Sequence, residues 1–136
     1  MHSRTEMCLL DIQTQRFMRL SSVGVEESMI SRHSMNEIVF AKFEEIDAPM
    51  VEKVTVKSTN IDFSHHTNNA EYIRLITNTY SVNELETRVM KEVEILYLNQ
   101  SYEGDILEIK KAKFPQKDII FIEKSGKPIV KCEIIF

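Results

Sequence analysis

The chain has 136 residues, enough for one domain with a continuous hydrophobic core. Its 17 basic and 21 acidic side chains give a formal net charge of -4 without a basic block, which argues against a nucleic-acid partner. No apolar run is long enough to span a bilayer, and the N-terminus lacks the hydrophobic stretch of a signal peptide. We therefore expect a cytoplasmic protein that does not enter the membrane.

The first 49 residues give weak signals of secondary structure. Residues 7–12 form a short apolar run, whose length favours a strand over a helix. Residues 25–34 have modest helical character, and residues 36–49 have the composition of an irregular linker. An isolated apolar strand must cover its free edge, so we expect the strand at 7–12 to dock on its own domain or on another chain.

The two cysteines, Cys8 and Cys132, show neither metal-binding nor redox spacing. Both lie in apolar, strand-like stretches, so we expect buried free thiols rather than a disulfide. The charged pairs Glu44-Glu45 and Lys110-Lys111 are expected on the solvated surface.

Residues 51–57 alternate between apolar and polar side chains, which predicts a half-buried strand that leads into a polar loop. An amphipathic helix follows this loop. Its predicted apolar stripe, at the three-and-four spacing of one helical face, consists of Tyr72, Ile73, Ile76 and Tyr80. Asn68 is suited to be the N-cap, and Glu71 three residues later completes a capping-box pattern, so the helix should begin near Asn69.

The remaining chain favours strands. After a short helical turn at 81–86, strands are predicted over 89–97, 106–113, 118–124 and 128–136. Lys124-Ser125-Gly126-Lys127 has the composition of a tight hairpin turn. One strand, one helix and four further strands with short turns predict an α+β fold in which an antiparallel sheet packs over a single helix.

The polar loop and the start of the helix carry a family motif. The run Asp62-Phe63-Ser64-His65-His66-Thr67-Asn68-Asn69-Ala70-Glu71-Tyr72 resembles the Asp-x-Asn-x-His-x-Asn-Asn-x-x-Tyr motif in the C-terminal hotdog domain of acyl-acyl-carrier-protein (acyl-ACP) thioesterases. Thr14-Gln15-Arg16-Phe17-Met18-Arg19-Leu20 resembles the Thr-x-Arg-x-x-Arg segment that leaves the first hotdog domain of that family. The resemblance implies a hotdog fold, with the sheet wrapped around one long central helix. Residues 50–136 would form a single hotdog domain, and residues 1–49 would hold a remnant strand of a preceding hotdog unit plus a linker.

The resemblance also implies a reaction, the hydrolysis of fatty acyl thioesters that terminates fatty acid biosynthesis, without a cofactor. The substrate would be a thioester of acyl carrier protein or of coenzyme A. Asp62 and His66 match the acid and the histidine of the family and would position or activate water. Unpaired N–H groups at the helix start, from Asn68 to Ala70, would hold the oxyanion. Structural roles stay open for both side chains, because Asp62 can cap its own turn and His66 can be a neutral, hydrogen-bonded histidine.

Two positions depart from the family pattern. Ser64 stands where the family has an asparagine, and Gln100 stands where it has a glutamate thought to help activate water. An amide can orient water but cannot take its proton. Because the alignment with the family has no fixed register over residues 99–104, Glu103 is an alternative to Gln100. Ser101 corresponds to a cysteine of the family. These departures leave an alternative function, that of a non-catalytic hotdog module that binds acyl chains or serves as an assembly partner.

Members of the family pair two hotdog units, so the resemblance implies a homodimer or pairing with another hotdog unit. The motif loop would then lie near the junction of the two units. No metal is expected, because the adjacent His65 and His66 should point apart and no second ligand pair has zinc spacing.

Overall fold

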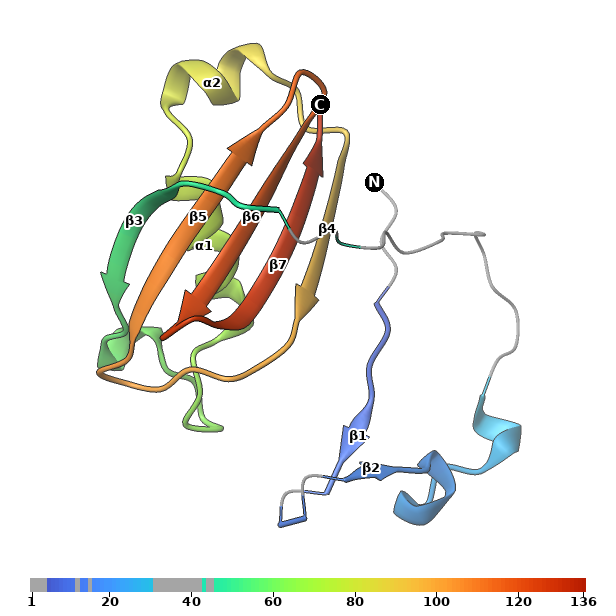
Figure 1. The fold of residues 1–136 in the computed structure, drawn as a ribbon. Coiled ribbons are helices and arrows are strands. Elements are labelled where there is room, and N and C mark those ends of the chain that lie inside the picture. The colour runs from blue at the N-terminus through green and yellow to red at the C-terminus, as the bar shows by residue number, and fades with distance from the viewer. Residues whose placement is uncertain (1–4, 12, 15, 31–42, 44–45) are drawn as a thin grey trace. The chain divides into compact units, whose positions relative to one another are not determined.

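The computed structural model describes residues 5–11, 13–14, 16–30, 43 and 46–136. The chain divides into two compact units, with the boundary between residues 40 and 41. The described part of the first unit contains a two-stranded sheet, and the second unit contains a five-stranded sheet with its helices (Figure 1).

The N-terminal unit is a small hairpin followed by two 3-10 turns. Its strands are antiparallel, with Leu9 opposite Met18. The elements are β1 (Leu9–Leu10), β2 (Phe17–Met18), η1 (Leu20–Val23) and η2 (Glu27–Met29). The strand predicted over 7–12 is therefore present but shorter, and Ile12 lies outside the described residues. Docking of this strand on another surface stays a prediction.

The helical character predicted over residues 25–34 is wrong for the described part of that stretch. Only the single 3-10 turn η2 forms there, and residues 31–34 lie outside the described residues. Of the predicted linker over 36–49, the structure describes residues 43 and 46–49.

The two thiols differ in their surroundings, although both are free. Cys132 is buried, as predicted, because it lies on the inner face of the large sheet. Cys8 is exposed, so the prediction of burial is wrong there. Its two-residue strand has no broad sheet to cover the side chain.

The second unit is built on an antiparallel sheet of five strands in the order β3-β5-β6-β7-β4. The strands are β3 (Met50–Thr55), β4 (Glu92–Tyr97), β5 (Ile106–Lys113), β6 (Lys117–Lys124) and β7 (Lys127–Ile135). The helices are η3 (Ser58–Asn60), α1 (Asn69–Asn78) and α2 (Val82–Thr87). Most strand predictions are confirmed to within one residue, but β4 starts at Glu92 rather than at 89. Its pairing with β7 begins at Glu92, which lies opposite Ile135.

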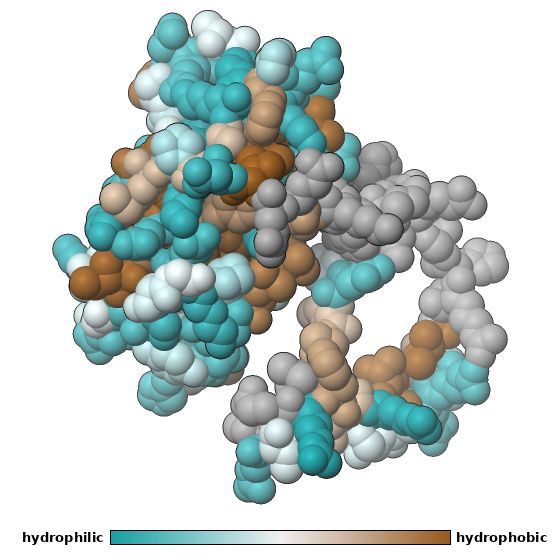
Figure 2. All heavy atoms as spheres, viewed as in Figure 1, coloured by the Kyte–Doolittle hydropathy of each residue, from teal (hydrophilic) through white to brown (hydrophobic). Residues whose placement is uncertain are grey.

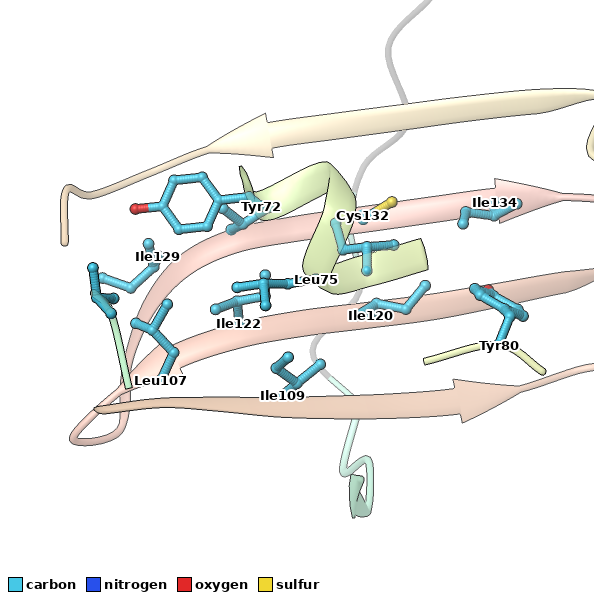
Figure 3. Packing of buried hydrophobic residues seen from close by; sticks show 13 residues of the cluster. Tyr72, Leu75, Tyr80, Leu107, Ile109, Ile120, Ile122, Ile129, Cys132 and Ile134 are labelled. Atoms are coloured by element: carbon cyan, nitrogen blue, oxygen red, sulfur yellow. The ribbon is translucent and has the colours of Figure 1, made fainter. Parts of the chain in front are cut away.

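The helix α1 packs on the inner face of the sheet and forms the main core with it (Figure 3). The buried side chains of α1 are Tyr72, Leu75 and Ile76, and Tyr80 follows just beyond its end. Ile73 is 45% exposed, so its place in the predicted apolar stripe is wrong. Leu75 is buried instead, because the face turned to the sheet is centred near Tyr72, and Ile73 lies beyond its edge. The sheet contributes Leu107, Ile109, Ile120, Ile122, Ile129, Val130, Cys132 and Ile134.

The outer face of the sheet carries a second, smaller core. Ile119 and Phe121 of β6 point to this face and are covered by Ile46 and Ala48, with Ala112 beside them. In Figure 1 the chain ahead of β3 crosses the sheet on the side opposite α1. The part of this unit turned to the viewer in Figure 2 is otherwise mostly hydrophilic, with hydrophobic residues in small patches. The central strand β6 is thus buried on both faces.

A buried charge cluster, Arg88, Lys111 and Asp118, lies at the C-terminal end of α1. The guanidinium of Arg88 donates to both carboxylate oxygens of the fully buried Asp118 at 3.0–3.2 Å. The ammonium of Lys111 donates to the carbonyl and the hydroxyl oxygen of Thr79 at 3.1 Å and lies 4.0 Å from Asp118. Lys111 is only 3% exposed, so the prediction that it lies on the solvated surface is wrong. Strand alternation turns Lys110 outward and Lys111 inward, beside Leu107 and Ile109.

Candidate functional site

The motif loop, residues 61–67, connects η3 to α1 at the end of the sheet opposite α2 (Figure 1). An antiparallel bridge between Ile61 and Thr67 closes its base. Inside the bridge, the N–H of Asp62 donates to the carbonyl of His66 at 3.0 Å, and the N–H of His65 donates to the carbonyl of Asp62 at 3.0 Å. His65 adopts a left-handed backbone with φ 63°. This tight reversal brings residues 62 and 66 together and turns His65 out to solvent.

Asp62, Ser64 and His66 form a hydrogen-bonded row across the loop. Oδ1 of Asp62 accepts from the N–H of Ser64 at 2.8 Å and from its hydroxyl at 2.5 Å. Oγ of Ser64 lies 3.2 Å from Nδ1 of His66. The Ser64 hydroxyl, followed by the Ser64 N–H, holds the pKa of the Asp62 carboxyl below its ordinary value, so this group is an anion at neutral pH. The structure thus brings together the two predicted site residues and one of the two substituted positions.

The imidazole of His66 packs against one aromatic ring. Its ring meets Tyr102 edge-on, with the centroids 5.2 Å apart and the planes at 66°. The hydroxyl of Tyr102 donates to Oε1 of Gln100 at 3.2 Å, so Gln100 is linked to His66 through one side chain. Gln100 and Glu103 are both exposed. Among the described residues, no three side chains of His, Cys, Asp or Glu gather in a way that could hold a metal ion.

A buried polar cluster anchors the motif loop from below. Oγ of Ser101 lies 2.7 Å from the hydroxyl oxygens of both Thr67 and Tyr72, and its carbonyl accepts from the N–H of Thr67 at 2.9 Å. Ser101 is fully buried, which fits a structural role at this position. This cluster was not predicted from the sequence. The available signal was a hydroxyl at Tyr72, on the predicted apolar face of the helix, since buried hydroxyls need partners.

The helix start is shaped by Asn68. Its side-chain oxygen accepts from the N–H of Ala70 at 2.9 Å, as predicted for an N-cap. The predicted capping box does not form, because the N–H of Asn68 donates to the carbonyl of Asn60 instead. Glu71 accepts from the side chains of Asn60 and Arg74. Because the N–H of Ala70 already donates to the side chain of Asn68, the N–H of Asn69 is the first donor at this helix end that remains for a ligand.

The edge strand β4 passes close to the helix start. The hydroxyl of Tyr97 donates to the carbonyl of Asn69 at 3.5 Å, and the ring of Tyr97 packs at a tilt against Tyr72. The Asp62–Ser64–His66 row lies in the loop that leads into α1, and the edge strand β4 lies beside the first turn of that helix. Among the described residues, no helix combines the length and the apolar character that crossing a bilayer requires.

Comparisons with known proteins give one family and a set of similar structures. Residues 43–135 match the family described as acyl-ACP thioesterase C-terminal domain. An acyl-ACP thioesterase from Bacteroides thetaiotaomicron has a TM-score of 0.79 and 19% identity to this chain, and the 12:0-ACP thioesterase from Umbellularia californica has 0.79 and 13%. Each similarity covers 93% of this chain and 52% of the other, so the chain spans about half the length of these proteins.

A smaller structure is also similar. A hypothetical protein from Staphylococcus aureus, solved in complex with CoA, has a TM-score of 0.55 and 16% identity, with 65% of this chain and 75% of that chain covered. No curated protein matches. The shared architecture confirms the predicted α+β hotdog fold, with the antiparallel sheet packed over α1. Because the family match extends over more than half of the sequence and includes the motif loop, this chain belongs to the acyl-ACP thioesterase C-terminal domain family.

Proposed function

We propose that this protein is a cytoplasmic thioester hydrolase that cleaves fatty acyl thioesters of acyl carrier protein or coenzyme A, as in the termination of fatty acid biosynthesis. The observation that carries the proposal is the Asp62–Ser64–His66 row in the loop that leads into α1. It provides an anion, a hydroxyl and an imidazole, with the hydroxyl in hydrogen-bond contact with each of the other two groups. The similarity to two ACP thioesterases and to a protein solved with CoA supports this choice of substrate.

In this mechanism the acyl carbonyl approaches the start of α1. The N–H of Asn69 and the positive end of the helix dipole stabilise the negative charge that develops on the carbonyl oxygen. A water molecule attacks the carbonyl carbon while His66 takes one of its protons, and Asp62 stabilises the imidazolium that forms. The C–S bond then breaks, the thiol of the carrier receives the proton, and the fatty acid leaves. This chemistry uses no cofactor.

A second hotdog unit completes the site in this proposal, most simply a second copy of this chain. β4 is an edge strand, and its exposed apolar side chains include Val93, Leu96 and Tyr97. Open strand edges with apolar side chains tend to pair with another strand. Because Tyr97 touches the carbonyl of Asn69, pairing there would bring the partner next to the proposed site. Light scattering should show a dimer that Leu96→Lys converts to a monomer, and a wild-type monomer would contradict the pairing.

A second candidate function, a non-catalytic hotdog module that binds acyl chains or assembles with a partner, is favoured by Gln100. This exposed amide stands where the family pattern has a glutamate, and it cannot accept a proton from water. The two functions differ in turnover but not in acyl binding. A binding measurement must therefore accompany the assay.

The test is steady-state hydrolysis of acyl-ACP and acyl-CoA thioesters of several chain lengths. We expect Asp62→Asn to lower kcat/KM by about 10²- to 10⁴-fold, the usual contribution of acid–base groups. Asp47→Asn is the matched control, because Asp47 is exposed and remote in sequence from the motif loop. Equal rates for wild type and Asp62→Asn would exclude the proposed catalysis. Calorimetric binding of a non-hydrolysable acyl-CoA analogue without any turnover would select the second candidate.

A further inference from the structure

We propose that Ser64 is a positioning residue that fixes the tautomer of His66. The Ser64 hydroxyl donates a hydrogen bond to Asp62, and its oxygen accepts a hydrogen bond from the protonated Nδ1 of His66. Nε2 of His66 then carries the lone pair that a base needs. The inference deepens the proposed function, on which its catalytic part rests. Its structural part, the position of one proton, can be tested without any substrate.

A serine hydroxyl has one proton and two neighbours here, so the two contacts must differ in kind. The contact with Oδ1 of Asp62 is 2.5 Å, the length of a hydrogen bond from a hydroxyl to an ionised carboxylate. The contact with Nδ1 of His66 is 3.2 Å, typical of a bond from N–H to oxygen. The serine proton therefore points to Asp62.

The tautomer of His66 follows from this assignment. With its proton directed at Asp62, Oγ of Ser64 presents only lone pairs to Nδ1 of His66. If Nδ1 also carried a lone pair, the lone pairs of Oγ would repel it, whereas an N–H on Nδ1 makes a hydrogen bond to Oγ. In a neutral imidazole one nitrogen carries the proton and the other accepts, so a proton on Nδ1 leaves Nε2 as the acceptor.

Among the described residues, the side-chain hydrogen bonds that link Asp62 to the His66 ring run through Ser64, and the direct charge interaction with His66 is the smallest of the influences that lower the pKa of Asp62. Within the described residues the two side chains form no direct ion pair, and Asp62 contacts the backbone of His66 through its own N–H. The ring packed against His66 belongs to Tyr102, and the charges near that ring, Lys124 and Asp105, pair with each other at 2.8 Å. The hydrogen-bonded link between the Asp62 anion and the His66 ring therefore depends on one hydroxyl, that of Ser64.

The substitution at position 64 suggests a rescue experiment. The family motif has an asparagine there, whose amide supplies a donor and an acceptor from separate atoms. Ser64 supplies both from a single oxygen. Ser64→Asn should therefore keep the link between Asp62 and His66, whereas Ser64→Ala should break it.

The first test is the ¹⁵N spectrum of the histidine rings at neutral pH, with the His66 signals assigned by His66→Asn. We expect wild type and Ser64→Asn to show a protonated Nδ1 and an unprotonated Nε2 on His66. In Ser64→Ala the population should shift toward the form protonated on Nε2. An Nε2-protonated His66 in wild type, or identical spectra for wild type and Ser64→Ala, would overturn the proposal. Ser58→Ala, on an exposed serine in η3, is the matched control.

The second test separates this inference from the proposed function. If the chain hydrolyses thioesters, Ser64→Ala should lower kcat at least about 10-fold with KM nearly unchanged, and Ser64→Asn should restore it. An acyl group found on Ser64 by mass spectrometry after mixing with substrate would overturn the positioning role, because Ser64 would then be the nucleophile. Loss of the expected tautomer refutes the inference alone, whereas absent hydrolysis with the expected tautomer refutes only the thioesterase proposal.

Discussion

The two ends of α1 both gather charged and polar side chains, but they use them in opposite ways. At the N-terminal end, Asp62, Ser64 and His66 lie in a loop open to solvent. At the C-terminal end, Lys111 and Asp118 are buried and are committed to partners inside the protein. Charged groups that are buried away from water need hydrogen bonds or ion pairs within the protein, so a change to them alters the free energy of unfolding. Charged groups at the solvated end are free to meet a substrate.

The predictions below test whether function and stability really divide between the two ends. Variants at the motif loop should change turnover and leave unfolding nearly unchanged. Variants at the buried charge cluster should do the reverse.

The largest effect is expected from His66→Asn, on the proposed thioester hydrolysis. Loss of the base should lower kcat/KM by about 10²- to 10⁴-fold. The free energy of unfolding should change by no more than about 0.5 kcal/mol, because the side chain lies on a surface loop. His65→Asn is the control, since His65 is exposed and asparagine tolerates its left-handed backbone. Equal losses for the two variants would remove His66 from the mechanism.

Asp118→Ala should be the most destabilising of these changes. It leaves Arg88 and Lys111 without their shared anion, and removal of one partner from a buried ion pair typically costs about 3–5 kcal/mol. Urea unfolding followed by circular dichroism would measure the loss. Glu108→Ala, which breaks a more exposed pair with Lys53, should cost less than about 1 kcal/mol. Comparable costs for the two variants would contradict the assignment of stability to the buried end.

Removal of the helix cap should have an intermediate effect. Asn68→Ala deprives the N–H of Ala70 of its acceptor and should lower the free energy of unfolding by about 1 kcal/mol. Asn68→Gly should lower the free energy of unfolding by only a few tenths of a kcal/mol, because glycine is tolerated at the N-cap position. Asn78→Ala, at the exposed last position of α1, should be neutral or slightly stabilising because alanine favours helix. A neutral Asn68→Ala would show that the cap is dispensable.

A separate effect on stability is a pH dependence from Lys111. Burial is the largest of the influences that lower the pKa of Lys111 to about 8, whereas an unfolded lysine has an ordinary pKa of about 10.4. Below pH 8 both states are charged, so the cost of the buried charge is fully present. Between these values the folded state has lost a proton that the unfolded state keeps, so this contribution to the free energy of unfolding rises with pH.

The comparison with Lys111→Met isolates that contribution. Cys132 acts in the opposite direction, because burial raises the pKa of its thiol to about 12 and the unfolded thiol ionises first. Both proteins share this effect, which cancels in their difference. Thermal unfolding at pH 7 and at pH 10 should therefore show that the stability of wild type relative to Lys111→Met is greater at the higher pH. A constant difference would mean that Lys111 titrates normally.

Local patterns predicted the elements of the second unit well. β5 was predicted with its observed bounds from alternation, and the turn after β6 was predicted from Ser125-Gly126. Both turn residues have positive φ, 51° and 76°, which is the geometry that the favoured hairpin turns require. The start of α1 followed from Asn68, because a cap is a short-range interaction between neighbours in the sequence.

The contacts that join distant parts of the chain were not predictable in the same way. Lys111 was assigned to the surface because its partners Thr79 and Asp118 lie on other elements. The residues of the proposed site came from the family resemblance. Their arrangement did not, because the left-handed backbone of His65, which turns His66 toward Ser64, has no signature in the sequence. The burial of Ser101 likewise depends on the loop that closes over it.

The cover on the outer face of β6 matters for anyone who produces this protein. Ile119 and Phe121 stay dry because Ile46 and Ala48 lie across them. A shortened chain beginning at Met50 would leave two large apolar side chains exposed in the middle of a sheet, where they would favour aggregation during expression. A recombinant hotdog domain should therefore begin ahead of Ile46 to stay in solution.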